Sequence, residues 1–153
     1  MKILVLMYHN VVSSSKDLHL YDVSLKAFRE QMVYLRDTHD AVRDTILTFD
    51  DGYKSWAHEV LDILNEAGLK AYFFICIEFM KKGSISKEDI IRLKDNGMVI
   101  GSHGMKHRFL HGLSDRELFY ELGESKKLLE DIVRDKIRYF PVPRGMHNKR
   151  ILK

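Results

Sequence analysis

The chain has 153 residues, of which 45% are hydrophobic and 31% charged, a balance typical of one globular domain spanning residues 1–153. Its 25 basic residues are scattered among 22 acidic ones, so the formal charge of +3 gives no reason to expect nucleic acid as a partner. No apolar run approaches the ~20 residues that a membrane span needs. The N-terminus lacks the features of a secretion signal, so the expected location is the cytoplasm.

Apolar runs and helical spacing alternate along the chain. Short runs rich in β-branched and aromatic residues predict strands, and periodic apolar positions between them predict helices. In chain order, the sequence predicts a strand over 3–8, a helix from Ser24, a strand over 46–49, a helix over 56–67, a strand over 71–77, a helix over 86–97, a strand over 98–100, a helix over 114–133 and a strand over 137–140.

This alternation predicts an α/β fold with parallel strands, whose βα units are wound with one hand into a barrel or an open sheet. A complete eight-unit barrel takes ~250 residues, so this chain has room for about five or six units. The single cysteine, Cys76, falls in an apolar run and is expected to be a buried, inert thiol.

Two adjacent carboxylates, Asp50 and Asp51, stand where the predicted strand over 46–49 ends and a loop begins. In parallel βα folds, ligands and catalytic groups collect at this edge of the sheet. Adjacent residues that leave a strand point in different directions, so one carboxylate can hold a cation while the other handles a proton. A solvated Asp-Asp-Gly turn is the alternative interpretation, because Asp and Gly are common in turns.

His103 and His107 follow the predicted strand over 98–100. They are four residues apart, so one helical turn of backbone would let both imidazoles share a metal ion. His107 and His111 have the same spacing, so the spacing alone does not identify a site. Two imidazoles and a carboxylate at one sheet edge are, however, typical of a catalytic zinc with open positions for water and substrate.

The sequence TFDDG over 48–52, together with Ser102, His103 and His107, resembles the first two motifs of the polysaccharide deacetylases with a NodB-homology domain, carbohydrate esterase family 4. The opening LMYHNV over 6–11 also resembles the start of the branch that deacetylates poly-N-acetylglucosamine. The resemblance implies a distorted or incomplete (β/α) barrel. It also implies hydrolysis of N-acetyl groups on an N-acetylated sugar or polysaccharide.

Carried over to this sequence, the resemblance implies that Asp50 is the general base. Asp51, His103 and His107 would hold a divalent metal ion, with zinc expected first and cobalt, nickel or iron as alternatives. The chemistry suits this division, because a divalent ion lowers the pKa of its bound water towards ~7 and a nearby carboxylate can take the proton.

The third motif departs from the family pattern. It reads FPVPRG over 140–145, with Pro141 where the family often has an arginine that orients the catalytic aspartate. Arg144 replaces an aromatic residue, and we expect it to take over the orientation of Asp50 from this neighbouring position. The orientation of Asp50 is the property that this departure puts in question.

Three residues are candidates for contacts with the substrate. Pro143 and Gly145 match the third motif of the family, and Tyr53 follows the TFDDG motif. The face of Tyr53 could stack on a sugar, as could that of Trp56, although Trp56 stands at the start of a predicted helix where a core position is the more common outcome.

In the family the chain continues through a further helix and two strands, which supply a histidine as general acid. This sequence stops at 148–153, so His9 and His147 are the candidate replacements. His9 stands at the end of the first strand, where strand ends converge, although it could equally pack beside Tyr8. The uncovered strand edges and helix faces predict a homodimer or a partner chain. The family's second strand is also expected to be missing or reduced between Leu35 and Thr48.

The sequence therefore predicts a metal-dependent N-deacetylase acting on an N-acetylated glycan. The alternative is a catalytically weak or inactive relative that keeps the metal and acts as a glycan-binding or assembly partner. A third hypothesis keeps the hydrolase and changes the substrate to a small non-sugar amide.

Overall fold

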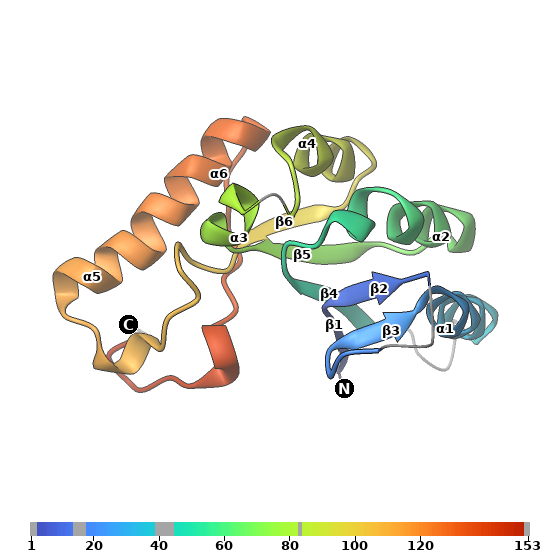
Figure 1. Cartoon of the computed structure of the whole chain (residues 1–153), viewed down its shortest axis with the longest axis horizontal. Coiled ribbons are helices and arrows are strands. Elements are labelled where there is room, and N and C mark those ends of the chain that lie inside the picture. The colour runs from blue at the N-terminus through green and yellow to red at the C-terminus, as the bar shows by residue number, and fades with distance from the viewer. Residues whose placement is uncertain (1–2, 14–17, 39–44, 83, 152–153) are drawn as a thin grey trace.

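The computed structural model describes residues 3–13, 18–38, 45–82 and 84–151, and a parallel sheet with the strand order β1-β4-β5-β6 runs through it (Figure 1). Its strands are β1 (Leu4–Tyr8), β4 (Thr45–Asp51), β5 (Ala71–Ile75) and β6 (Val99–Ser102). A short parallel pair, β2 (Asn10–Val12) with β3 (Asp22–Ser24), lies beside it and was not predicted. The predicted α/β fold with parallel strands is confirmed, and over the described residues the sheet stays open.

Helices follow the strands in the alternation that the sequence predicts. They are α1 (Leu25–Asp37), α2 (Glu59–Ala67), α3 (Ile77–Lys81), α4 (Lys87–Asp95), α5 (Asp115–Phe119) and α6 (Ser125–Val133). Capping boxes at Ser86 and Ser114 begin α4 and α5, and Gly68 ends α2 in the left-handed conformation. Among the described residues, no helix combines the length and apolar character that crossing a membrane requires.

An aromatic cluster around Phe49 of β4 forms the centre of the core. The Phe49 ring stacks on Phe73 at 4.7 Å and on Tyr8 at 5.3 Å between centroids, and Trp56 meets it edge-on at 6.0 Å. Phe28 of α1 closes the cluster from one side of the sheet. The Trp56 side chain is completely buried, so it is a core residue rather than part of a sugar-binding surface.

The segment 137–140, predicted as a strand, is not one. The Ser102 N–H donates to the Tyr139 carbonyl at 3.0 Å, so the segment does run beside β6. The Ile137 N–H, however, donates to the Glu130 carboxylate at 3.0 Å and is lost to a ladder. Pro141 then follows without any N–H to offer, so a regular strand does not form.

Other predicted boundaries shift by a few residues. The strand over 71–77 ends at Ile75, because the Ile77 and Glu78 N–H groups turn to the carbonyls of Gly104 and Met105 and begin α3. The helix over 56–67 begins as the 3₁₀ turn η1 (Lys54–Ala57), and β6 runs over 99–102 instead of 98–100. The reduced strand expected between Leu35 and Thr48 falls partly on 39–44, outside the described residues.

The helix predicted over 114–133 is continuous but contains a wide turn. Between α5 and α6, Tyr120–Glu124 is π-helical. Ser125 explains the widening, since its hydroxyl donates to the Glu121 carbonyl at 2.6 Å and lies 3.1 Å from the Leu122 carbonyl. Such bonds compete with the helical ladder and often mark functional sites.

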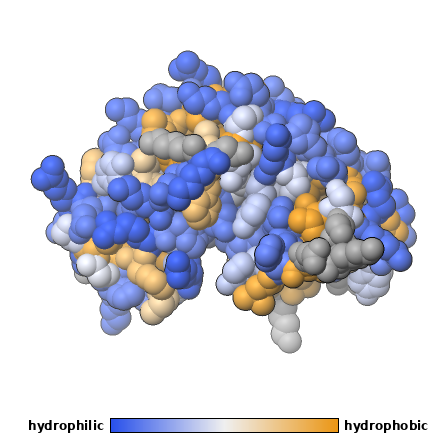
Figure 2. Space-filling view, in the orientation of Figure 1, coloured by the Kyte–Doolittle hydropathy of each residue, from blue (hydrophilic) through white to orange (hydrophobic). Residues whose placement is uncertain are grey.

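The surface of the molecule is notched along one edge (Figure 2). In the space-filling view, polar residues cover most of the visible face, and its lower edge is notched between the part built by β1–β3 and the part built by α5 and the C-terminal segment (Figure 2). Apolar residues gather on both sides of this notch.

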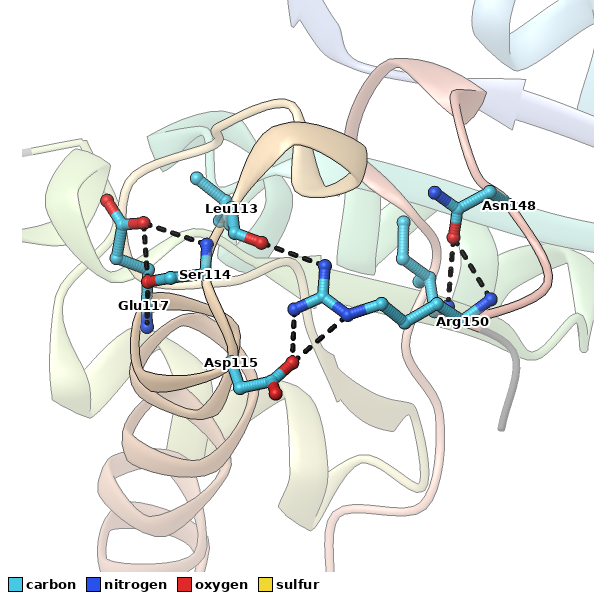
Figure 3. Close-up of polar contacts among 7 residues, drawn as sticks. Leu113, Ser114, Asp115, Glu117, Asn148 and Arg150 are labelled. Carbon is cyan, nitrogen blue, oxygen red and sulfur yellow. Dashed lines mark hydrogen bonds and ion pairs between the residues drawn. The ribbon is translucent and has the colours of Figure 1, made fainter.

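The C-terminal segment is tied to the start of α5. The Arg150 guanidinium donates to the Leu113 carbonyl at 2.8 Å and forms an ion pair with Asp115 (Figure 3). The Asn148 side-chain oxygen accepts from the main-chain N–H groups of Arg150 and Ile151. These contacts fix the path of the chain after the third motif.

Candidate metal centre and active site

Asp50 and Asp51 are the last two residues of β4. The sheet register places Asp51 opposite Ile75 at the end of β5. Asp51 has a φ of 90°, a conformation that non-glycine residues rarely adopt, and the Cys76 N–H holds the bend by donating to the Asp51 carbonyl at 3.0 Å. Backbone outliers of this kind cluster at functional sites, where the surrounding structure holds them.

His103 follows β6 directly and is 2% exposed. Its main-chain N–H donates to the Ile75 carbonyl at 2.9 Å, so the imidazole begins at the same sheet edge as the aspartates. Its Nδ1 lies 3.1 Å from the Pro141 carbonyl oxygen, which can only accept, so Nδ1 carries the proton and Nε2 keeps a free lone pair. His107 has a φ of 53° and stacks on Phe79 at 5.8 Å.

Asp51, His103 and His107 converge as the sequence predicts. Asp51 Oδ1 lies 3.3 Å from His107 Nε2 and 3.7 Å from His103 Nε2, and the three potential ligand atoms all lie within 4.8 Å of one another. Asp51 Oδ1 is buried without a hydrogen-bond partner among the described residues. Leaving a buried carboxylate oxygen unpaired is costly, and a divalent cation at this point would pair it. The donor set, two imidazoles and a carboxylate, therefore fits zinc or a similar ion.

Asp50 lies beside these ligands, with its Oδ2 4.0 Å from His103 Nε2. Burial, and next the charge of Asp51, raise the pKa of Asp50 to about 7. Burial, and next the charge of His107, lower the pKa of His103 to about 4. In the metal-free protein His103 is therefore neutral at pH 7, as binding a metal ion would require, and Asp50 titrates near neutrality.

The structure does not bring Arg144 to Asp50. Arg144 is exposed, has a φ of 61°, and its guanidinium lies over the Phe109 ring at 4.5 Å. Within the described part of the chain, no ion pair or hydrogen bond joins it to Asp50. The third motif reaches the site through a different group, the Pro141 carbonyl that orients His103.

The predicted substrate-binding residues lie on two segments. Tyr53 is half-buried beside Trp56, at 6.2 Å between ring centroids. Burial, and next the charge of Asp51, raise the pKa of Tyr53. Pro143 is buried and Gly145 exposed in the 3₁₀ turn η4 (Pro143–Gly145).

The structure separates the two candidate acids. His9 lies just past β1, half-buried, and its ring stacks on Tyr21 at 4.8 Å rather than on Tyr8. Burial lowers the pKa of His9 and the charge of Asp51 raises it, so His9 is within electrostatic reach of the site. His147 is exposed on the C-terminal segment.

Sequence reasoning missed the groups that hold the ligands in place. The Pro141 carbonyl left no signal, because any residue type supplies a carbonyl. Glu121 and Ser125 are buried, at 1% and 0% exposure, yet stand in a stretch that reads as an amphipathic helix. The one available signal was the pair of polar residues at i, i+4 on the apolar side of that helix.

Comparison with known proteins identifies relatives of the whole chain. A family model described as polysaccharide deacetylase matches residues 38–153. YxkH of Bacillus subtilis is 28% identical over 171 aligned positions, which cover 99% of this chain and 60% of YxkH. The peptidoglycan-N-acetylmuramic acid deacetylase PdaA of the same organism is 29% identical over 78% of this chain and 44% of its own length. The chain thus spans less than two thirds of these curated relatives.

Solved structures show the same fold. The Streptococcus pyogenes deacetylase PplD, in complex with acetate, superposes with a TM-score of 0.86 at 21% identity. The match covers 99% of this chain and 78% of PplD. This likeness shows that the two chains share a fold.

Proposed function

Because the chain belongs to the polysaccharide deacetylase family, we propose that it is a metal-dependent hydrolase that removes N-acetyl groups from an N-acetylated sugar or polysaccharide. One observation carries the proposal: His103 and His107 converge on Oδ1 of Asp51, a buried oxygen without a hydrogen-bond partner among the described residues, and Asp50 lies beside them. The name of PdaA, a deacetylase of peptidoglycan N-acetylmuramic acid, supports an N-acetylated hexosamine as the substrate class.

Asp51, His103 and His107 would hold the divalent ion. When bound, the ion would act as a Lewis acid that polarises the amide carbonyl and acidifies a water molecule. Asp50 would take a proton from a water molecule as the water oxygen attacks the carbonyl carbon. The hydrogen bond to Pro141 keeps the His103 ring in the tautomer that presents Nε2 to the ion.

Breaking the C–N bond then releases acetate and requires a proton on the leaving nitrogen. We assign this transfer to His9, the candidate histidine that lies within reach of the charge of Asp51. Burial lowers the pKa of His9, so a proton held on its ring is given up readily to the leaving nitrogen. The proton removed from the water balances the one added to that nitrogen. The half-buried ring of Tyr53 and the turn at Pro143 and Gly145 would contact the sugar.

The test is acetate release. The protein is stripped with chelator, reloaded with zinc or cobalt, and incubated with N-acetylglucosamine oligomers and with peptidoglycan. We expect metal-dependent acetate release that Asp50→Asn lowers about 100- to 10,000-fold, because the general base is lost. Metal-independent release, or an Asp50→Asn variant as active as the parent, would contradict the proposal.

The proton donor is tested in the same assay. We expect His9→Ala to lower kcat at least about 100-fold, because an amine is a poor leaving group without a proton. His147→Ala is the matched control and should keep the parental rate, since His147 is exposed on the C-terminal segment. Equal effects of both substitutions would remove His9 from the mechanism.

A second candidate function is a metal-binding relative with weak or no turnover that binds glycans or assembles with a partner. The position of Arg144 favours it, because the structure stacks this residue on Phe109 and leaves Asp50 without an arginine partner among the described residues. Stoichiometric metal binding without acetate release from any of the glycans would select this function.

A further inference from the structure

A buried carboxylate lies behind the loop that carries the two histidines. Glu121, on the π-helical turn between α5 and α6, is 1% exposed. Its Oε2 accepts hydrogen bonds from the main-chain N–H groups of Met105 at 2.9 Å and Lys106 at 3.0 Å. These two residues lie between His103 and His107, in the loop 103–107, which we call the ligand loop. One side chain from a helix distant in sequence therefore holds the centre of this loop by hydrogen bonds.

The loop needs such a grip because its backbone is unusual. Gly104 and His107 both have positive φ, at 89° and 53°. On one side, the first N–H groups of α3 hold the loop through the carbonyls of Gly104 and Met105, at 3.1 and 2.9 Å. On the other side, Glu121 holds its N–H groups. The ligand loop is therefore clamped between α3 and Glu121.

The fit between Glu121 and the loop is close. A Cβ added at Gly104 would lie 3.1 Å from Glu121 Oε2, tighter than ordinary contact, so a glycine lets the carboxylate approach. A network fixes the helix as well: the Ser125 hydroxyl lies 2.7 Å from the Ser102 hydroxyl, which accepts from the Gly104 N–H at 3.2 Å. The π-helical turn, the end of β6 and the ligand loop are thus hydrogen-bonded into one unit.

The second oxygen of Glu121 carries a further cost. Oε1 is buried and has no hydrogen-bond partner among the described residues. An unpaired buried oxygen lowers stability, so a residue chosen for fold stability alone would more often be apolar here. The cost is consistent with a carboxylate kept for the two hydrogen bonds that its other oxygen makes.

We infer that Glu121 is a positioning residue for the metal centre: by holding the Met105 and Lys106 N–H groups, it sets the loop so that Nε2 of His103 and of His107 both face Asp51. This inference rests on the metal site of the proposed function. Glu121 itself contributes no ligand, and it acts through the loop.

The experiment measures metal binding instead of turnover. Metal-free protein is titrated with Co²⁺, the visible absorption is recorded, and affinity is measured by competition with a chromogenic chelator. We expect Glu121→Ala to bind Co²⁺ about 10- to 100-fold more weakly than the parent and to change the absorption spectrum, as is usual when a group supporting metal ligands is removed. Glu121→Gln should bind within about threefold of the parent, because its amide oxygen can accept both hydrogen bonds.

Two further variants distinguish a loss of loop positioning from a general loss of stability. Glu130→Ala removes another helix glutamate that accepts a main-chain N–H, that of Ile137, and should lower the melting temperature without changing the Co²⁺ affinity or spectrum. Glu121→Asp keeps the charge but shortens the reach by one methylene. It should weaken Co²⁺ binding about tenfold and decides the matter if Glu121→Ala does not fold.

The outcomes separate this inference from the proposed function. Parental Co²⁺ affinity and spectrum in folded Glu121→Ala, or in Glu121→Asp, would overturn the role of Glu121 while leaving the metal site intact. Failure of the parent itself to bind Co²⁺ would overturn the proposed function. In that case the imidazole NMR signals of His103 and His107 in metal-free protein decide: Glu121→Ala should shift both, Glu130→Ala neither, and an unchanged pair would overturn the inference as well.

Discussion

The Asp50 carboxyl group gives a pH dependence of stability whose sign can be worked out. Its pKa is raised by burial from 3.8 to about 7 in the folded protein. The folded state therefore binds this proton more tightly than the unfolded state, and the contribution of Asp50 to stability falls as pH rises from about 4 through 7. His103, whose pKa is lowered from 6.5 to about 4, contributes with the opposite sign over part of this range, so only a comparison with an Asp50 variant isolates the effect. Above pH 7 the folded, metal-free protein contains a buried ionised carboxylate.

The corresponding variant is Asp50→Asn in metal-free protein. Asparagine does not ionise, so we expect the variant to melt close to the parent at pH 4 and several degrees above it at pH 8. Thermal melts followed by circular dichroism across this range, in chelator, measure the difference. A difference between the two proteins that stays constant with pH would show that Asp50 is not buried in its charged form.

The Cys76 thiol is expected to be unreactive in the folded protein. The thiol is completely buried, lies 3.7 Å from the Met105 carbonyl oxygen, and burial raises its pKa to about 11. We expect no reaction of the folded protein with a disulfide reagent at pH 8, and one equivalent of reaction once guanidinium unfolds it. Rapid stoichiometric labelling of the folded protein would contradict this burial.

The site residues divide into those that the sequence can predict and those that it cannot. Asp51, His103 and His107 are predictable because two strand ends in a parallel sheet meet at one edge, and few residue types bind metals. The Pro141 carbonyl and Glu121 are not, because their roles depend on a contact with a segment distant along the chain. The expectation for Arg144 followed from family spacing, and the local turn with positive φ sends its side chain to Phe109 instead.

The contact between β6 and the segment 137–140 connects the sheet to the candidate metal site. A Cβ at Gly101 would lie 2.5 Å from the Phe74 ring and 2.9 Å from the Tyr139 carbonyl oxygen. Both distances are shorter than real Cβ contacts. The segment 137–140 can therefore lie this close to β6 only because residue 101 has no side chain. Two residues further on, the Pro141 carbonyl holds His103.

We therefore expect Gly101→Ala to destabilise the protein by about 1–3 kcal/mol, as is typical when a methyl group is forced into a packed interior. It should also weaken metal binding, because the segment that carries the Pro141 carbonyl is pushed away. Gly112→Ala is the matched control, since nothing lies within 4 Å of its added Cβ. Urea unfolding compares the two, and equal midpoints would contradict the packing seen here.

The sequence predicts the elements whose signals lie in a few neighbouring residues. It does not predict those that depend on hydrogen bonds to residues distant along the chain. The strand β4 and the capped helices α4 and α5 carry their signals in a few neighbouring residues. The helix α3 begins instead where its first N–H groups meet carbonyls of the ligand loop, about 27 positions along the chain. Because a hydrogen-bond partner so distant leaves no local pattern, the predicted strand ran on through 76–77.

The β1 edge of the sheet is open and carries exposed apolar side chains. β1 pairs with β4 on one side, and no described strand pairs with its other side. Leu4, Val5 and Met7 are 49%, 53% and 60% exposed. With α1 they line a groove of about 670 Å³. An open strand edge with an apolar face is a template for association with another chain.

We predict that this edge binds a second copy of the chain. Sedimentation velocity of the 153-residue chain at rising concentration should show a dimer, and Val5→Lys should shift it towards monomer, because a lysine on an edge strand opposes pairing. Phe119→Lys replaces an apolar residue on α5 that is 70% exposed. It controls for non-specific hydrophobic association and should leave the dimer unchanged. A parent that stays monomeric at every concentration would mean that β1 is not a self-association edge, and equal loss of dimer in both variants would place the interface elsewhere.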